Sequence, residues 1–318
     1  MTIIPKIRGG HMNNYATDAN IYRTGKRRKK KRRHYFIRLI VYIVLIFLIT
    51  YNVSKFVLNF PSYLSAHYGK ENQTYSNNMD NTPSIDKPVI RNDSEVMAQL
   101  KSLSDTDKNI KYVYKHSDKY SDTLLSALAN NPEMAEFVRN YPDASSTVTG
   151  GFTSDETYEN NPLFLQWDKR WGYSKYGDDC IGLSGCGPTC LSMVIFSLTG
   201  DETATPDKIS DYSMENDFYV KGTGTDWSLM TNAASIYGIT ASELSLDESV
   251  MKRCIDGGGK IICAMRAGDF TTSGHFIEIY GYTNEGFMVN DPNSTARSNC
   301  LWDYDTLSPQ IRNLWGYN

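Results

Sequence analysis

The feature that most limits how this chain can fold is a long apolar run placed directly after a block of positive charge. Residues 26–33 are eight consecutive Lys and Arg, and residues 35–54 then carry a single charge, Arg38. A helix of about 20 apolar residues spans the hydrocarbon core of a bilayer, which is about 30 Å thick. Lys and Arg that flank such a helix stay on the cytoplasmic side. We therefore expect a transmembrane helix over residues 35–55, preceded by a basic cytoplasmic tail at 1–34.

Two other interpretations of this region compete with a membrane anchor. A basic block can bind nucleic-acid phosphates, but the apolar run behind it favours a role in membrane insertion, so no nucleic-acid partner is expected. A secretory signal peptide usually has a short charged region and a small-residue cleavage site. Here 34 residues precede the apolar run, and residues 51–55, Tyr-Asn-Val-Ser-Lys, offer no Ala-x-Ala pattern. We expect an uncleaved single-pass anchor in the cell membrane, with the chain beyond it extracytoplasmic.

The rest of the chain divides by composition into two linkers, a small helical region and one larger domain. Residues 56–94 carry scattered Pro, Asn and Ser without a sustained period, which predicts a linker. Residues 95–141 regain helical spacing and contain Asn-Pro-Glu at 131–133, a pattern typical of helix starts. Residues 142–160, with Pro, Ser, Thr and Gly, form a second linker. Residues 161–318 hold all five Trp and all six Cys and are long enough for one domain with its own core.

Cys186 stands at the start of a predicted helix. The apolar run at 188–199 has helical spacing and stops at Gly200, a residue type that commonly ends helices. Backbone N–H groups and the helix dipole stabilise a thiolate at that position. The glycines on either side of Cys186 leave the sulfur open to a substrate. The pattern predicts a nucleophilic cysteine.

His275 is the single histidine of the C-terminal domain and therefore the candidate base. Residues 274–282 alternate like a strand, residues 282–286 are typical of a turn, and residues 287–290 are typical of a return strand. Such a hairpin brings Asp291, at the end of the return strand, back towards His275. A carboxylate there can fix the tautomer of the imidazole. The Asp could also belong only to a strand-ending turn.

The chain order of a cysteine-bearing helix, a histidine-bearing strand and an aspartate is that of papain-like folds. The sequence resembles the C39-like peptidase family of this superfamily. The resemblance rests on Gly-Cys-Gly-Pro-Thr at 185–189, Gly-His-Phe at 274–276, Asn-Asp-Pro-Asn at 290–293, Gln-Trp-Asp-Lys-Arg-Trp-Gly at 166–172 and Gly-Thr-Gly-Thr-Asp-Trp at 222–227. It implies an α+β fold in which the cysteine helix packs on an antiparallel sheet that carries the histidine and the aspartate.

The resemblance covers about residues 161–318 and implies a role for four side chains. Cys186 would be the nucleophile, His275 the general base and then acid, and Asp291 the orienting group. Gln166 would stand in the oxyanion hole with the Cys186 backbone N–H, although from the residues alone it is equally an ordinary strand residue. The implied function is a cysteine peptidase that hydrolyses a peptide or protein substrate through an acyl-enzyme. It needs no metal or other cofactor, and we expect it on the outer face of a bacterial membrane.

One property of well-known relatives does not carry over. Those peptidases cleave leader peptides beside the ATPase of an exporter, but no Gly-x-x-x-x-Gly-Lys-Ser/Thr motif is present here. Acyl transfer to an amine would use the same residues as hydrolysis. A catalytically inactive peptide-binding module of the same fold is the alternative from another functional class, because folds are reused without their chemistry.

The cysteines allow two further interpretations. Cys180, Cys186 and Cys190 with His275 could form a Cys₃His zinc site, but the tight Cys-x-x-Cys pairs typical of structural zinc are missing. An extracytoplasmic domain also permits disulfides. Their pairing cannot be deduced from the sequence.

Overall fold

Two folded regions follow one another in the part of the chain that the structure, a computed structural model, describes: Tyr42 and residues 86–318. The predicted membrane span at 35–55 lies outside the described residues except for Tyr42, as do the basic tail at 1–34 and residues 56–85. Among the residues that are described, no helix has the length and apolarity needed to cross a membrane.

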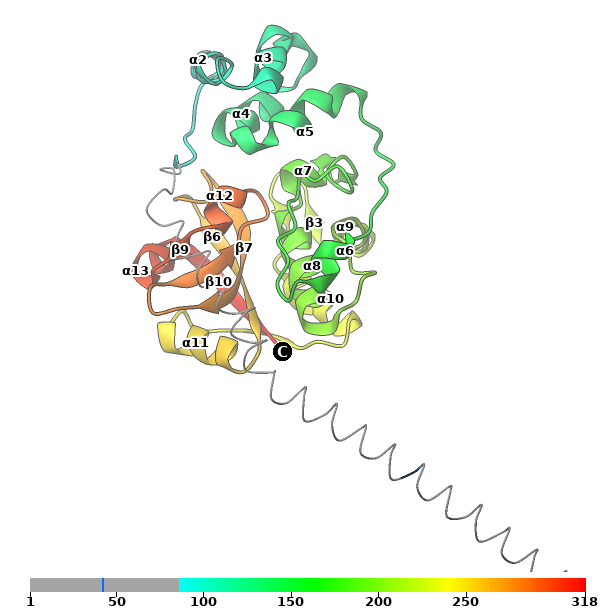
Figure 1. Cartoon of the computed structure of the whole chain (residues 1–318), viewed down its shortest axis with the longest axis vertical. Helices are drawn as coiled ribbons and strands as arrows, with labels where there is room; N and C mark the ends of the chain where they lie inside the picture. Colours follow the sequence, from blue (N-terminus) through cyan, green and yellow to red (C-terminus); the bar gives the residue numbers. More distant parts are fainter. Residues whose placement is uncertain (1–41, 43–85) are drawn as a thin grey trace, which may run out of the picture. The chain divides into compact units, whose positions relative to one another are not determined.

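The first region is a group of short helices over residues 93–143 (Figure 1). Its members are α2 (Asp93–Leu103), α3 (Lys108–Lys115), η2 (Ser117–Lys119), α4 (Asp122–Asn130), η3 (Pro132–Met134), α5 (Ala135–Asn140) and η4 (Tyr141–Asp143). Local side chains start several of them: Asn92 and Glu95 form a reciprocal capping box at α2, and Ser121 caps α4. The apolar faces of these helices meet in a hydrophobic cluster that also includes Cys180 of the second region.

The second predicted linker, residues 142–160, is partly structured and packs on the domain that follows. It contains α6 (Ser154–Tyr158). Phe152 packs against the aromatic core of the domain, and Arg170 pairs with Glu156 at 2.6 Å. Both contacts join residues that lie apart in the sequence, so local composition alone did not reveal them.

A six-stranded antiparallel sheet forms the centre of the second region, with the strand order β5-β10-β6-β7-β8-β9. Its strands are β5 (Ala241–Glu243), β6 (Lys260–Arg266), β7 (Gly274–Tyr282), β8 (Phe287–Asn290), β9 (Leu301–Trp302) and β10 (Ile311–Tyr317). The expected strand, turn and return strand are confirmed, because Tyr282 pairs with Phe287 and Glu278 pairs with Asn290. Two short hairpins lie outside the sheet: β1 (Lys175–Tyr176) with β2 (Asp179–Cys180), and β3 (Tyr219–Val220) with β4 (Gly224–Thr225).

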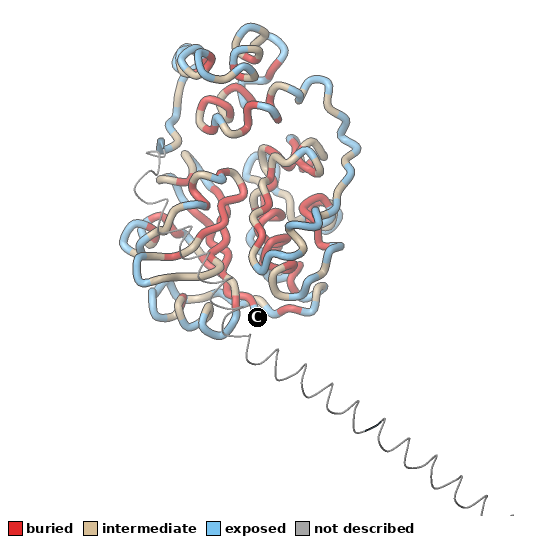
Figure 2. Tube along the Cα trace, viewed as in Figure 1, coloured by how far each residue is buried: buried red, intermediate tan, exposed pale blue. Residues whose placement is uncertain are grey.

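Helices pack on both faces of the sheet, whose buried residues Figure 2 shows along the central strands. The helices of the second region are α7 (Ile181–Ser184), α8 (Cys186–Thr199), α9 (Pro206–Glu215), α10 (Ser228–Ile236), α11 (Glu248–Asp256), α12 (Thr295–Ser298), α13 (Tyr304–Leu307) and η5 (Ser308–Gln310). Helices α8, α9 and α10 share a core with Ile262 of β6, whereas Met251 of α11 meets Ile261 on the opposite face. Successive strand residues point to opposite faces, so β6 serves both cores. This mixed helix-and-sheet architecture agrees with the expected α+β domain.

Candidate active site

Cys186 is the first residue of α8, and its side chain is partly exposed. Thr189 closes the first turn, since its N–H and its hydroxyl both donate to the Gly185 carbonyl, at 3.0 and 2.8 Å. Gly187 is required by a close approach, because a Cβ there would lie 2.9 Å from the Thr225 side chain of β4. The thiol therefore stands at a helix start, where backbone N–H groups favour an anion.

His275 is the second residue of β7 and is almost completely buried. Its Nε2 atom lies 2.7 Å from Oδ1 of Asp291, and Cys186 lies close enough to the ring to affect its pKa. Since Nε2 is engaged by Asp291, Nδ1 is the nitrogen left for the thiol. Burial lowers the pKa of His275, but the Asp291 carboxylate and Cys186 outweigh burial and raise that pKa to about 9.

Asp291 directly follows β8 and has no solvent exposure. Oδ1 accepts hydrogen bonds from His275 and from the Asn293 N–H at 2.8 Å, and Oδ2 accepts one from Nε of Arg297 at 2.5 Å. Burial raises the pKa of the Asp291 carboxyl, but His275 and Arg297 together hold that pKa below its ordinary value. The structure thus brings Cys186, His275 and an ionised Asp291 together.

Arg297 is a site residue that the sequence did not single out. It belongs to the one-turn helix α12, is 3 % exposed, and reaches back six residues to the carboxylate of Asp291. A buried arginine is rare unless it is paired, and its partner here is the carboxylate of Asp291. The only signal in the sequence is an Arg soon after the Asp-Pro-Asn motif, which by itself is typical of a solvated surface.

Gln166 is buried and forms hydrogen bonds both to the segment after Asp291 and to the helix before Cys186. Part of its side-chain amide is therefore already engaged within the protein. Its backbone N–H donates to the Pro292 carbonyl at 2.7 Å, and its Nε2 donates to the Gly182 carbonyl of α7 at 2.9 Å. One N–H of that amide is therefore engaged, which leaves the second N–H for a substrate oxygen. Within the described residues, Oε1 of Gln166 has no hydrogen-bond partner.

All six thiols are free. Cys190, one turn after Cys186, is completely buried, and burial raises its pKa well above the ordinary value. In the part of the chain that the structure describes, no group of three His, Cys, Asp or Glu side chains could hold a metal ion.

Glu278 is a second buried carboxyl, three residues after His275 on β7. It has no solvent exposure and accepts a hydrogen bond from Nδ2 of Asn290 at 2.9 Å. Burial raises its pKa to about 7, although Asn290 and Lys260 oppose the increase. No hydrogen bond joins it to Cys186, His275 or Asp291 among the described residues. It alternates with apolar residues along the strand, so the sequence did not single it out.

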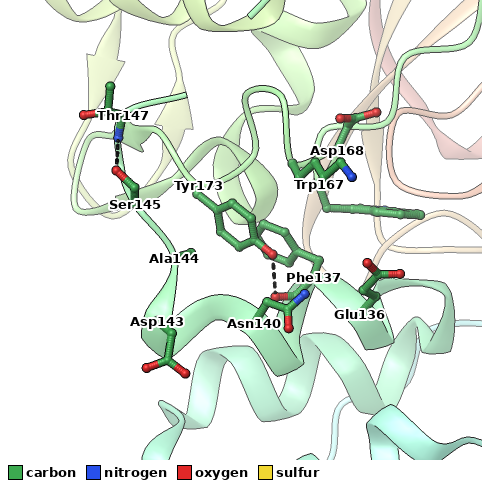
Figure 3. Close-up of a pocket in the computed structure, with 11 residues that line it drawn as sticks. Glu136, Phe137, Asn140, Asp143, Ala144, Ser145, Thr147, Trp167, Asp168 and Tyr173 are labelled. Carbon is green, nitrogen blue, oxygen red and sulfur yellow. Dashed lines mark hydrogen bonds between the residues drawn. The ribbon is translucent and has the colours of Figure 1, made fainter. Parts of the chain in front are cut away.

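An open cavity of about 640 Å³ lies between α5 and the segment that follows Gln166 (Figure 3). Its walls include the Trp167 indole and the stacked rings of Phe137 and Tyr173, whose centroids are 4.5 Å apart. None of Cys186, His275 and Asp291 lines it. The cavity is therefore separate from these three residues.

A cysteine at a helix start beside a buried histidine and aspartate, on a mixed helix-and-sheet domain, is typical of papain-like peptidase folds. Residues 158–317 match the family model described as the Peptidase C39 like family. This match covers half of the chain and contains all four predicted site residues. The chain belongs to the C39-like peptidase family, which confirms the resemblance seen in its sequence motifs.

Individual proteins are more distant. A solved structure described as that of a C39-like peptidase from Bacillus anthracis is similar over 50% of this chain and 94% of its own length. The sequence identity is 14%, and the TM-score is 0.35. No curated protein matches the chain.

Proposed function

We propose that this chain is a membrane-anchored cysteine peptidase that hydrolyses peptide bonds on the extracytoplasmic side of the membrane. The observation that carries the proposal is the buried His275 ring, which is hydrogen-bonded to Asp291 at 2.7 Å and lies close enough to Cys186, at the start of α8, for that thiol to raise its pKa. Membership of a peptidase family supports the reaction class. The anchor and its orientation rest on the charge pattern around the predicted span at 35–55.

In the first half of the reaction, the Cys186 thiolate attacks the carbonyl carbon of the scissile peptide bond, and a carbon–sulfur bond forms. The negative charge moves to the carbonyl oxygen, where the Cys186 backbone N–H and the second N–H of Gln166 would stabilise it. The His275 imidazolium then gives its proton to the leaving nitrogen, and the carbon–nitrogen bond breaks. The products are a free amine and a thioester on Cys186.

In the second half, His275 takes a proton from water, and the resulting hydroxide attacks the thioester carbonyl. The carbon–sulfur bond breaks, the carboxyl product leaves, and the thiolate–imidazolium pair is restored. Asp291 stays ionised throughout and holds the ring in the tautomer that presents Nδ1 to the sulfur. An amine in place of water would give acyl transfer with the same residues.

The direct test is digestion of a peptide library by the purified full chain in detergent, with products identified by mass spectrometry. New peptide ends should form with the wild type and with Cys254→Ala, which removes a half-buried thiol of α11. They should be absent with Cys186→Ala. Cleavage that survives Cys186→Ala would contradict the nucleophile, and peptides bound but uncut by the wild type would indicate a binding module.

A further inference from the structure

The segment after Asp291 is held from outside the peptidase domain by a carboxylate of the helical region. Glu133 of η3 accepts a hydrogen bond from the Ser294 hydroxyl at 2.6 Å. It also accepts from the backbone N–H groups of Thr295 and Ala296, at 2.8 and 3.3 Å. These are charge-assisted bonds, which are stronger than bonds between neutral groups. They fix the start of α12, a helix of a single turn that cannot be stable alone.

Asn131 holds the same segment two residues from Asp291. Its Nδ2 donates to the backbone carbonyl of Asn293 at 2.5 Å and to the Asn293 side-chain oxygen at 3.2 Å. The Asn131 side chain is 5 % exposed, so these bonds are shielded from water. Trp167 reinforces this point of attachment, since its indole N–H donates to the same carbonyl at 3.2 Å.

The other side of this segment, residues 292–298, contacts the catalytic carboxylate. The Asn293 N–H donates to Oδ1 of Asp291, and Arg297 donates to Oδ2. Both donors stand within a few residues of the atoms that Asn131 and Glu133 hold. Residues 292–298 are therefore hydrogen-bonded both to the helical region and to the carboxylate of Asp291.

The break between α4 and α5 explains why these two side chains are available. Helix α4 ends at Asn130, and Pro132 follows at the first position of η3. In this turn, Oδ1 of Asn131 accepts the N–H of Glu133 at 3.2 Å, which ties the two residues together. The Asn-Pro-Glu motif thus starts a helix and also presents two polar side chains to residues 292–298.

We propose that Asn131 and Glu133 are positioning residues of the active site, so that the helical region is part of the catalytic unit. They act through residues 292–298 on Asp291, and through Asp291 on His275. The inference rests on the proposed function, because it assigns a role in orienting the same Asp291 and His275. Under this proposal the helical region helps to orient the site residues, whereas a spacer would only set the distance between the predicted anchor and the peptidase domain.

Few charged groups act on the residues that link Glu133 to His275. The described groups that act on the His275 ring are Asp291 and Cys186, and those that act on Asp291 are His275 and Arg297. Glu133 forms no ion pair with any residue that the structure describes. Its removal would therefore act on the site through hydrogen bonds and position, not through the loss of a nearby counter-charge.

The test uses iodoacetamide as the probe, which needs no knowledge of the substrate. An ordinary thiol is largely protonated at pH 6, so fast alkylation there reports a thiolate paired with the imidazolium. The rate of Cys186 labelling is measured on the full chain by mass spectrometry at pH 6 and at pH 9.5. The ratio of the two rates cancels changes in access to the sulfur. Burial raises the pKa of Cys254 and of Cys300, so these half-buried thiols should not compete at pH 6.

Glu133→Ala should lower the ratio by about 10- to 100-fold, since a displacement of about 1 Å in a catalytic group has effects of that size. Glu133→Gln keeps one acceptor oxygen and should lie between Ala and the wild type. Asn131→Asp loses the amide donor but keeps the acceptor for the Glu133 N–H, and it should lower the ratio in the same direction. Glu136→Gln, an exposed carboxylate three residues on with no bond to residues 292–298, is the matched control and should leave the ratio unchanged.

The outcomes separate this inference from the proposed function. Equal ratios in the wild type, Glu133→Ala and Asn131→Asp, each with a cooperative thermal transition, would contradict the positioning role and leave the peptidase proposal standing. If Glu133→Ala lacks that transition, the labelling ratios of Glu133→Gln and Asn131→Asp test the positioning role in its place. A wild type without fast labelling at pH 6 would contradict the proposed function itself.

Discussion

At the residue scale, the pKa of His275 is set by burial and by Asp291 acting in opposite directions. A His with a raised pKa keeps its proton up to that pKa, so His275 stays protonated to about pH 9. We expect the alkaline limb of kcat/KM for a cleaved peptide near pH 9. Asp291→Asn should lower kcat/KM by about 100-fold and move the limb down by about 1 pH unit or more.

The comparison of single deletions tests the assigned roles of the same two residues. His275→Ala removes the group that moves the proton, whereas Asp291→Ala removes only the group that orients it. The loss of kcat/KM should therefore be larger for His275→Ala. A larger loss for Asp291→Ala, or an unchanged alkaline limb in Asp291→Asn, would contradict the orienting role.

Glu278 gives a prediction about stability instead of activity. Its pKa is about 7 when folded and near 4.5 when exposed. Between these values the unfolded chain loses the proton first, so this carboxyl lowers the free energy of unfolding as pH rises from about 4.5 to 7, by about 3 kcal/mol. Glu278→Gln keeps an acceptor for Asn290 and has no charge to lose. In urea unfolding, the free energy of unfolding of Glu278→Gln should rise relative to that of the wild type as pH increases from about 4.5 to 7. A difference that stays constant with pH would contradict a raised pKa for Glu278.

At the scale of elements, the contact between α8 and β4 fixes where the thiol stands. A Cβ at position 187 would meet the Thr225 side chain at 2.9 Å, so Gly187→Ala must shift the helix start or β4. Overpacking of this kind costs about 1–3 kcal/mol, and we expect a lower midpoint in thermal unfolding together with slower Cys186 alkylation at pH 6. A Gly187→Ala chain with both properties unchanged would show that the site tolerates the shift.

The same elements show which structural features the sequence could predict. The β7–β8 hairpin and the end of α8 at Gly200, whose φ of 70° is left-handed, follow from local patterns of alternation, turn residues and helix stops. Arg297 and Glu133 could not be predicted in this way, because the role of Arg297 depends on its burial and the contacts of Glu133 join residues far apart in the sequence. The bond from Ser294 to Glu133 joins residues 161 positions apart, and no local rule indicates it.

At the scale of the whole molecule, the charge pattern predicts how the chain is oriented in a membrane. Eight cations precede the predicted span at 35–55, so the peptidase domain should face away from the cytoplasm. A protease added to intact cells should reach the predicted linker at 56–94 and remove the domain, as detected with an antibody to the C-terminus. Lysed cells are the control for cleavability. Protection in intact cells with cleavage after lysis would contradict the orientation.

The central claim is that Cys186 and His275 form a reactive pair, and alkylation across pH 5 to 9 tests it most directly. Iodoacetamide should label Cys186 of the full chain at acidic pH, and His275→Ala should abolish that labelling while leaving the reaction at high pH intact. Labelling that appears only near the ordinary thiol pKa of about 8.5, equally in both proteins, would contradict a thiolate–imidazolium pair and favour an inactive binding module.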